Sequence, residues 1–250
     1  MKNNNLHVNN KWPKLIIVDT IGIAIGDNEK ITNIINETIK RNGIITEKWV
    51  IRALIGKPIF NIAEIVCERW LKEPQQKVIE KIATEIIEQF RVSFTEKGNS
   101  QISKDLIEFL IAARNENCRI LGVSWLPSYV TNEIFQRSEL THYLHGWISY
   151  NEVPRFHPFP DIIQKISQKE DIYDPNQIAH IGNSKISLLS AYHAQCNWNI
   201  LLATNEETDW SAYPHTHFID KTSNLKSIFQ STPKKSKPKL TYLFKKGKPS

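Results

Sequence analysis

The 250-residue sequence lacks any apolar run long enough to cross a membrane, and its opening segment, MKNNNLHVNN, lacks the apolar stretch of a signal peptide. Cysteine is also scarce. The three cysteines, Cys67, Cys118 and Cys196, are far apart and in no metal-ligand spacing. These absences argue against a membrane protein, a disulfide framework and a cysteine metal site. We therefore expect a cytoplasmic protein with three reduced, buried thiols.

Acidic residues are missing from the segment 231–250, which holds seven lysines, three prolines and a glycine. Subtracting these seven charges from the net charge of +6 leaves −1 for the other 230 residues, so the basic character belongs to this tail. Its composition disfavours regular structure, and we predict disordered tails at 1–12 and 231–250. Two interpretations stay open for the C-terminal tail: a polybasic arm that contacts a polyanion, and a solubilising end.

The first predicted strand is Leu15–Val18, whose continuous apolar run is typical of a strand buried on both faces. The segment that follows, 28–98, reads as four consecutive helices without a strand. Gly43 is a plausible stop for the first of them, and Pro58 and Pro74 are placed to open the third and fourth. Such a run is expected to pack as its own small bundle, with a hinge at 98–100.

Helices and strands alternate after residue 99. Four helices are predicted, at 103–116, 128–137, 160–168 and 185–194. Each is followed by a predicted strand, and these strands are, in order, RILGVS, GWISY, QIAHIG and WNILLAT. This alternation predicts a parallel sheet with helices on both faces. We therefore expect an α/β protein with a Rossmann-like core, formed by 13–27 and 99–230, into which the all-helical unit 28–98 is inserted. No internal repeat is found.

Polar residues that follow the predicted strands are the candidates for chemistry, because ligands bind at the carboxyl ends of parallel strands. Asp19 is suited to nucleophilic attack or cation binding, and Ser124 offers a hydroxyl. Arg155 or His157 would supply positive charge, and Asn183 offers a carbonyl oxygen to a metal. Each of these residues, considered alone, also has a purely structural interpretation. Ser124 would then be a helix cap, for example, and His157 an ordinary loop residue.

The order of these residues resembles that of the haloacid dehalogenase-like (HAD) superfamily, in the helical-cap branch that includes phosphonoacetaldehyde hydrolase and β-phosphoglucomutase. Four segments between about residues 13 and 205 carry the resemblance. VDTIGI is similar to the Asp-x-Asp-Gly-Thr loop, and ILGVSWLPSYVTNEIF to the strand that ends in Ser or Thr. VPRFHPFPDII is similar to the segment with a Lys or Arg before Pro-x-Pro-Asp, and AHIGNSKISLLSAYHAQC to the Gly-Asp-x-x-x-Asp motif.

The resemblance implies roles for these positions. Asp19 matches the nucleophile that forms an aspartyl-phosphate, Ser124 the group that holds the phosphoryl, and His157 the Lys or Arg. It also implies Mg²⁺ as cofactor, because a dication relieves the repulsion between a carboxylate and a phosphate dianion. The implied metal positions are Asp19, Ile21 through its backbone carbonyl, and Asn183. Three further positions are assigned to substrate binding: Gly22, Trp125 and Arg155.

The sequence departs from the family pattern at several of these positions. Ile21 stands where the second Asp, the general acid/base, is expected, and isoleucine cannot transfer a proton. The acidic pair of the fourth motif is replaced by Asn183 and Ser187, which weakens the expected Mg²⁺ site. Trp125 would narrow the pocket or simply pack in the core.

Two functions follow from this comparison. The first is a HAD-like hydrolase that acts through Asp19 on a small phosphorylated or phosphonate metabolite. The alternative is a catalytically inactive HAD-fold protein with a binding or regulatory role, because the proton donor and two metal-binding carboxylates are absent. The partner expected in either case is a small anionic molecule. Polyanion contact through the lysine-rich tail is a third, separate hypothesis.

Overall fold

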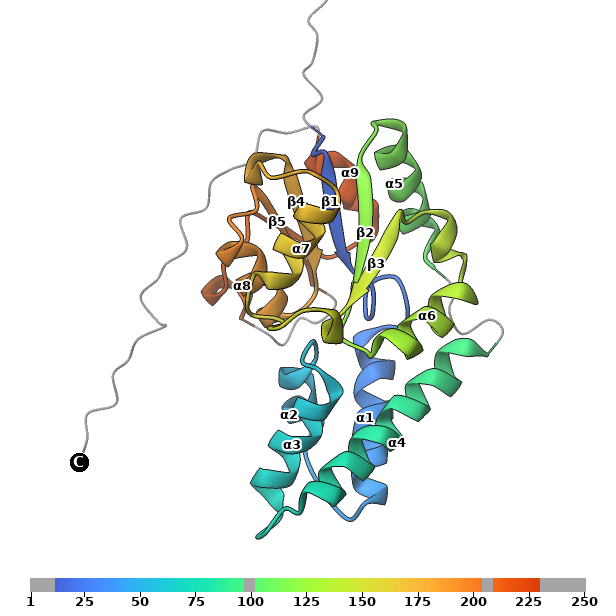
Figure 1. Ribbon diagram of the computed structural model, residues 1–250, viewed down its shortest axis with the longest axis vertical. Helices are drawn as coiled ribbons and strands as arrows, with labels where there is room; N and C mark the ends of the chain where they lie inside the picture. The colour runs from blue at the N-terminus through green and yellow to red at the C-terminus, as the bar shows by residue number, and fades with distance from the viewer. Residues whose placement is uncertain (1–11, 97–101, 204–208, 230–250) are drawn as a thin grey trace, which may run out of the picture.

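A computed structural model describes residues 12–96, 102–203 and 209–229 and shows a parallel sheet joined to a helical unit (Figure 1). The sheet has six strands in the order β3-β2-β1-β4-β5-β6, and every neighbouring pair is parallel. This confirms the predicted α/β class and its Rossmann-like parallel sheet. The strands are β1 (Leu15–Asp19), β2 (Arg119–Ser124), β3 (Gly146–Ser149), β4 (Ile178–Gly182), β5 (Trp198–Leu202) and β6 (His217–Ile219).

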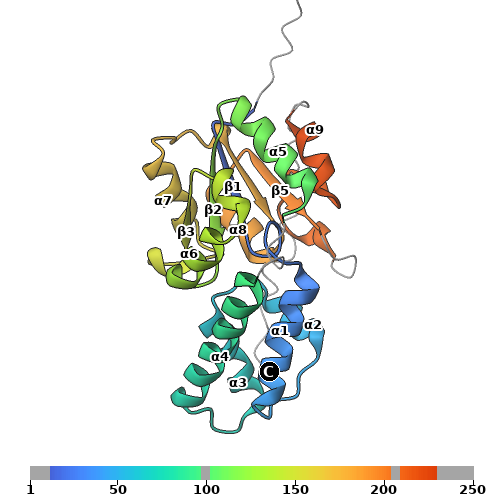
Figure 2. The ribbon, with the colours of Figure 1, turned by 90° about the vertical axis from the view of Figure 1, so that its right-hand side faces the viewer.

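Helices cover both faces of this sheet (Figures 1 and 2). Helices α7 and α8 lie on the face toward the viewer in Figure 1, and α5 and α9 lie behind the sheet, where they pack against each other. Strands β1 and β4 are buried at every position because they have neighbours on both edges and helices on both faces. The core helices are α5 (Lys104–Asn115), α6 (Ser128–Gln136), α7 (Asp161–Lys169), α8 (Lys185–His193) and α9 (Leu225–Ile228).

Four helices follow β1 and form the helical unit, which lies beyond the carboxyl ends of the strands (Figure 1). We call it the cap. Its helices pack through apolar stripes at helical spacing, such as Ile31, Ile35 and Ile39 on the first and Ile82, Ile86 and Phe90 on the last. The helices are α1 (Asn28–Arg41), α2 (Lys48–Leu54), α3 (Ile59–Trp70) and α4 (Gln76–Thr95).

Several element boundaries differ from the sequence prediction. Strand β1 extends by one residue to include Asp19, which pairs with Val123 of β2. Helix α4 begins at Gln76 rather than at Pro74, and β3 ends at Ser149, after which Tyr150 opens a 3₁₀ turn. Strand β6 and the short helix α9 were not predicted, because three residues of strand and four of helix are too short to show a period.

All three cysteines are free and buried, which confirms the prediction of buried thiols. No helix in the described residues is long and apolar enough to span a membrane. The lysine-rich segment 231–250 and the hinge predicted at 98–100 lie outside the described residues, so both stay predictions.

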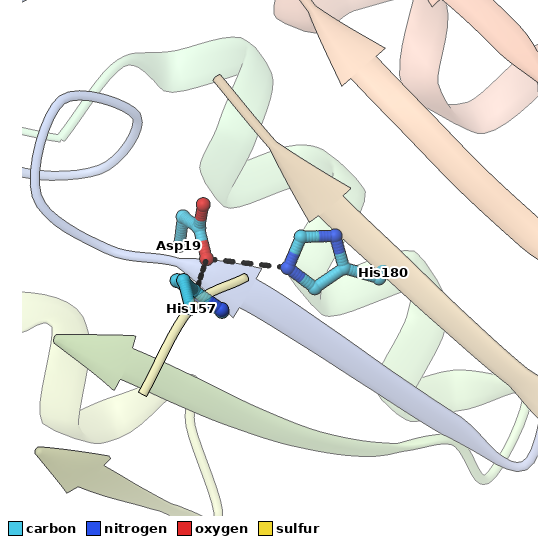
Figure 3. Close-up of side chains that lie close together, drawn as sticks. All are labelled: Asp19, His157 and His180. Carbon is cyan, nitrogen blue, oxygen red and sulfur yellow. Dashed lines mark hydrogen bonds and ion pairs between the residues drawn. The ribbon is translucent and has the colours of Figure 1, made fainter. Parts of the chain in front are cut away.

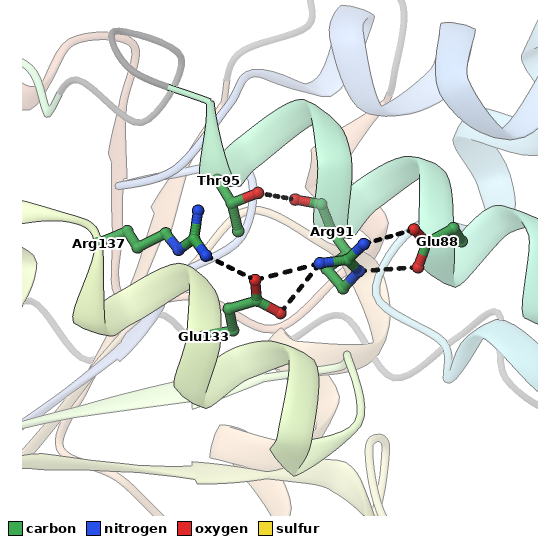
Figure 4. A network of polar contacts seen from close by, with 5 residues as sticks. All are labelled: Glu88, Arg91, Thr95, Glu133 and Arg137. Atoms are coloured by element: carbon green, nitrogen blue, oxygen red, sulfur yellow. Dashed lines mark hydrogen bonds and ion pairs between the residues drawn. The ribbon is translucent and has the colours of Figure 1, made fainter.

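The cap is held against the core by an aromatic contact and by a polar network. Phe90 of α4 meets the ring of Trp125 edge-on, with ring centroids 5.4 Å apart. Next to it, Arg91 of α4 forms an ion pair with Glu133 of α6 at 3.1 Å (Figure 4). Glu88 and Arg137 complete the network on either side, at 2.6 Å from Arg91 and 3.2 Å from Glu133. The aromatic pair is buried, whereas the ions are partly exposed.

We predict that the aromatic contact, and not the ion pairs, stabilises the cap on the core. Trp125→Ala should lower the free energy of unfolding by about 3–5 kcal/mol, because it removes a large buried side chain. Glu133→Gln breaks two partly exposed ion pairs and should cost less than about 1 kcal/mol. Urea unfolding followed by circular dichroism measures both. Equal losses in the two variants would contradict this ranking.

Candidate functional site

The candidate site is centred on Asp19, the last residue of β1, where the strand ends beneath the cap. Strand β1 has β2 on one side and β4 on the other, so Asp19 lies in the middle of the sheet. The residue is only 6% exposed. Burial of a carboxylate is costly unless charged or hydrogen-bonding groups compensate it. The neighbours of Asp19 therefore decide what the site can do.

His180 of β4 is the first of these neighbours, and the strand register places it there. His180 pairs with Ile17 across the parallel β1–β4 ladder, and side chains two apart on a strand share a face, so His180 lies on the face of Asp19. Its Nε2 lies 3.2 Å from Asp19 Oδ1. Gly182 follows on the same face. A Cβ there would lie 2.7 Å from His180 Cε1 and 3.2 Å from Asp19 Oδ2, so glycine provides the space for this contact.

His157 approaches the same carboxylate oxygen from the loop between β3 and α7 (Figure 3). Its Nε2 lies 3.6 Å from Asp19 Oδ1, which is too long for a hydrogen bond and is an ion pair only when the imidazole is protonated. The loop is fixed by hydrogen bonds from core helix α8: Ser190 Oγ donates to the Phe159 carbonyl, and His193 Nδ1 contacts the Pro158 carbonyl. The ring of His157 also packs on Phe156, with centroids 4.2 Å apart.

The electrostatics of the site favour an ionised Asp19. Burial acts to raise the pKa of this carboxyl, but the charge of His180 and the contacts with His157 outweigh it and hold the pKa well below its ordinary value. Burial has the opposite consequence for the imidazole, because it lowers the pKa of His157 despite the attraction of Asp19. The site therefore keeps an anionic carboxylate next to an imidazole whose neutral form is favoured.

The loop after Asp19 is compact and contains the position where a proton donor was expected. The backbone N–H groups of Ala24 and Ile25 donate to the Thr20 carbonyl, and Gly22 closes the turn at φ +93°, a conformation that suits glycine. The side chain of Ile21 is fully buried. Asp27, the next carboxylate along the chain, caps α1 by accepting the Lys30 N–H at 2.7 Å. It is thus engaged at the start of the cap.

Three of the sequence-predicted residues have partners away from Asp19. The Ser124 hydroxyl accepts hydrogen bonds from the Leu126 N–H and the Thr131 hydroxyl, but it does not cap α6, whose N-cap residue is Pro127. Trp125 lies in the contact with the cap and is 4% exposed. Arg155 is exposed, pairs through two nitrogens with Asp161, and its guanidinium lies over Phe159. The roles of these three in phosphoryl or substrate binding stay predictions.

Asn183 and Ser187 occupy the positions of the expected acidic pair. Asn183 donates from its amide nitrogen to the Asn28 side chain of α1 at 3.1 Å, next to Gly22. The Ser187 hydroxyl donates to the Ser184 carbonyl at 3.0 Å, within the first turn of α8. Both side chains are therefore engaged in local hydrogen bonds, and Asn183 links the core to the cap.

A cavity of about 480 Å³ lies between the cap helices α1 and α2 and the core. Asn183 is in its wall, and Arg52 and Lys185 bring cationic groups to it. Arg52 is paired with Glu29 at 2.7 Å, and Lys185 lies over the ring of Tyr213. Asp19 does not line this cavity, and the Asn28–Asn183 hydrogen bond lies at the boundary between the cavity and the loop that follows Asp19.

The donor atoms around Asp19 do not match the preference of Mg²⁺. This hard cation takes oxygen ligands in octahedral geometry, usually from carboxylates and water. Within the described residues, the group that could hold a metal consists of one carboxylate and two imidazoles: Asp19, His157 and His180. Mg²⁺ thus stays a prediction from the resemblance, and the metal roles of Ile21 and Asn183 stay predictions with it.

Sequence reasoning missed His180. Its signal was present, because an ionisable residue in the otherwise apolar strand Ile178–Gly182 is unusual in a fully buried strand. His180 lies two positions before the end of the strand, whereas the candidate residues were those that follow each strand. Only the register with β1 shows that His180 shares a face with Asp19.

Neither the family models nor the curated proteins include a match to this chain. Solved structures do match it. One, described as a predicted phosphoglycolate phosphatase from Haemophilus somnus 129PT, is 17% identical with a TM-score of 0.72, over 87% of this chain and 98% of that one. A candidate haloacid dehalogenase-like hydrolase from Bacteroides fragilis is 15% identical with a TM-score of 0.71, over 85% and 99%.

A third structure, of a phosphonoacetaldehyde hydrolase-like protein from Oleispira antarctica, is 14% identical with a TM-score of 0.72, over 87% of this chain and 91% of that one. The matches extend over nearly the full length of all three proteins. The chain therefore has the fold of the HAD-like proteins, which confirms the fold that the sequence resemblance implied. At these identities the likeness establishes the fold and leaves the activity to be argued from the site.

We predict that Gly182→Ala displaces the His180 ring and the Asp19 carboxylate that both histidines face, because the added methyl group would lie too close to Ser187 Oγ, His180 Cε1 and Asp19 Oδ2. The imidazole signals of His157 and His180 in ¹H–¹³C NMR spectra should shift relative to the wild type. The control is Gly43→Ala, where nothing lies within 4 Å of the added Cβ, although φ is +81°. Unchanged histidine signals in the Gly182 variant would contradict the geometry described above.

Proposed function

We propose that the protein is a phosphatase-type hydrolase in which Asp19 attacks the phosphorus of a small phosphorylated metabolite. The observation that carries the proposal is the placement of a buried, ionised carboxylate at the carboxyl end of a central strand, beneath a cap. Similar structures include proteins described as a phosphoglycolate phosphatase and as phosphonoacetaldehyde hydrolase-like, which supports this reaction class. A phosphonate is the second substrate class to test.

The chemistry requires a free carboxylate oxygen. Asp19 Oδ1 faces the two histidines, whereas no hydrogen bond from a described residue is directed at Oδ2. Attack by Oδ2 on phosphorus forms the aspartyl-phosphate and breaks the bond to the leaving oxygen, which takes a proton from water. A second water then attacks phosphorus, releases inorganic phosphate and a proton, and restores the carboxylate.

Water has this part in the proposal because Ile21 provides no acidic side chain beside Asp19, and the imidazoles of His157 and His180 face Oδ1 rather than the attacking Oδ2. A side-chain acid or base typically accelerates such a step by 10²–10⁴-fold, so we expect slow turnover compared with an enzyme that has one. The lining of the 480 Å³ cavity has two cationic residues, Arg52 and Lys185, and one acidic residue, Asp209, and this balance favours an anionic substrate. Because Asp19 is nearly buried, the substrate would reach it when the Asn28–Asn183 contact opens.

A second function, binding without turnover, is favoured by two specific observations. The side chain of Ile21 is fully buried, and Asp19 is 6% exposed. In that case the cavity between cap and core would hold a phosphorylated ligand, and Asp19 would contribute only to the stability of the site. The two functions differ in what happens when Asp19 loses its nucleophilic oxygen.

The test is a panel of phosphate esters and phosphonates, assayed for phosphate release with wild type, Asp19→Asn and Asp27→Asn. Each is assayed with Mg²⁺, Mn²⁺ or Zn²⁺ and in chelator. We expect wild-type turnover of at least one substrate and a loss of more than about 10³-fold in Asp19→Asn, because an amide is a poor nucleophile. Asp27→Asn is the matched control, since asparagine caps a helix as well as aspartate does.

Two results would overturn the proposal. Equal turnover in wild type and Asp19→Asn would show that Asp19 is not the nucleophile. An absence of turnover on every substrate, together with calorimetric binding of a phosphate ester, would establish the binding function instead.

A further inference from the structure

We propose that Asp19, His157 and His180 form a binding site for a divalent transition metal of the Zn²⁺ class. The three side chains come from β1, from the loop before α7 and from β4, and they converge on one point (Figure 3). Their candidate ligand atoms all lie within 4.8 Å of one another. The inference does not depend on the hydrolase activity, because metal binding is measured without a substrate.

The distances suit direct coordination. Zn²⁺ binds imidazole nitrogen at about 2.0–2.1 Å, so two ligand atoms on a tetrahedral ion lie about 3.3 Å apart. Asp19 Oδ1 lies 3.2 Å from His180 Nε2 and 3.6 Å from His157 Nε2, on either side of that value. The two imidazole nitrogens lie within 4.8 Å of each other, so they would have to move closer together for all three atoms to coordinate one ion.

The second observation is an unsatisfied side chain directed at this point. His157 is 7% exposed, and neither of its ring nitrogens has a hydrogen-bond partner among the described residues. A buried polar nitrogen without a partner typically costs about 1–3 kcal/mol, so such groups are rare in native structures. A metal ion bound to Nε2 would satisfy this nitrogen and would also neutralise the buried Asp19 carboxylate.

The donor types select the class of ion. Two imidazoles and one carboxylate suit Zn²⁺ and its first-row neighbours, whereas Mg²⁺ prefers oxygen ligands. Neither residue at the expected acidic positions carries a charge: Asn183 donates its amide nitrogen to Asn28, and the Ser187 hydroxyl donates to the Ser184 carbonyl. Catalytic zinc sites have three protein ligands and leave a coordination position open for water or substrate, whereas structural zinc sites have four protein ligands. The three residues here match the catalytic arrangement.

The experiment uses the full chain without a purification tag, because a histidine tag binds the same ions. The protein is stripped with chelator and dialysed against ZnCl₂, and bound metal is measured by mass spectrometry and calorimetry. We expect one Zn²⁺ per chain. His157→Gln and His180→Gln should each weaken binding at least 10-fold, and His142→Gln, an exposed histidine outside the site, should leave it unchanged.

X-ray absorption at the zinc edge keeps the test independent of how the variants fold. In the wild type it should show a shell of N and O ligands near 2.0 Å with the outer-shell scattering of two imidazoles. Millimolar MgCl₂ should not displace the ion. Zinc binding of equal strength in the double variant His157→Gln/His180→Gln would overturn the proposal. The proposal would also be overturned if Mg²⁺ bound as tightly as Zn²⁺ and if neither His157→Gln nor His180→Gln weakened that binding.

Discussion

The structure depends on the burial of one negative charge, the carboxylate of Asp19, in the middle of a parallel sheet. Moving a carboxylate out of water costs several kcal/mol after the protein has relaxed, and nearby groups must offset that cost. Two imidazoles lie 3.2 and 3.6 Å from the same oxygen. The backbone accommodates them, because Gly182 has no side chain to obstruct His180, and the loop of His157 is tied to α8.

Three residues stand at positions where the sequence resemblance implies carboxylates, and all three are uncharged and buried. The side chains that replace the expected carboxylates, Ile21, Asn183 and Ser187, are buried, and the two polar ones are hydrogen-bonded within the cap–core contact or the first turn of α8. The negative charge that would hold a hard cation is therefore reduced to Asp19. The imidazoles of His157 and His180 lie beside it, so the possible ligands at this point are one carboxylate and two nitrogen donors.

Most of the fold could be predicted from the sequence, because long apolar strands and amphipathic helices are local patterns. Asp19 was predicted as the polar residue at the end of a strand, and His157 from its place in the order of the four segments that carry the family resemblance. His180 was not, because its position depends on the register between β1 and β4, a non-local property. The partners of Ser124 and Arg155 likewise appear only in the folded chain, where Thr131 and Asp161 engage them.

The central claim is that the three side chains around Asp19 act as one ligand set. The most direct test is anomalous diffraction at the zinc edge from crystals of the full chain grown with Zn²⁺. The account predicts a single strong peak about 2.0–2.2 Å from Asp19 Oδ1 and from the Nε2 atoms of His157 and His180. A map without a peak at these atoms, or with the ion bound at Asn183 instead, would contradict it.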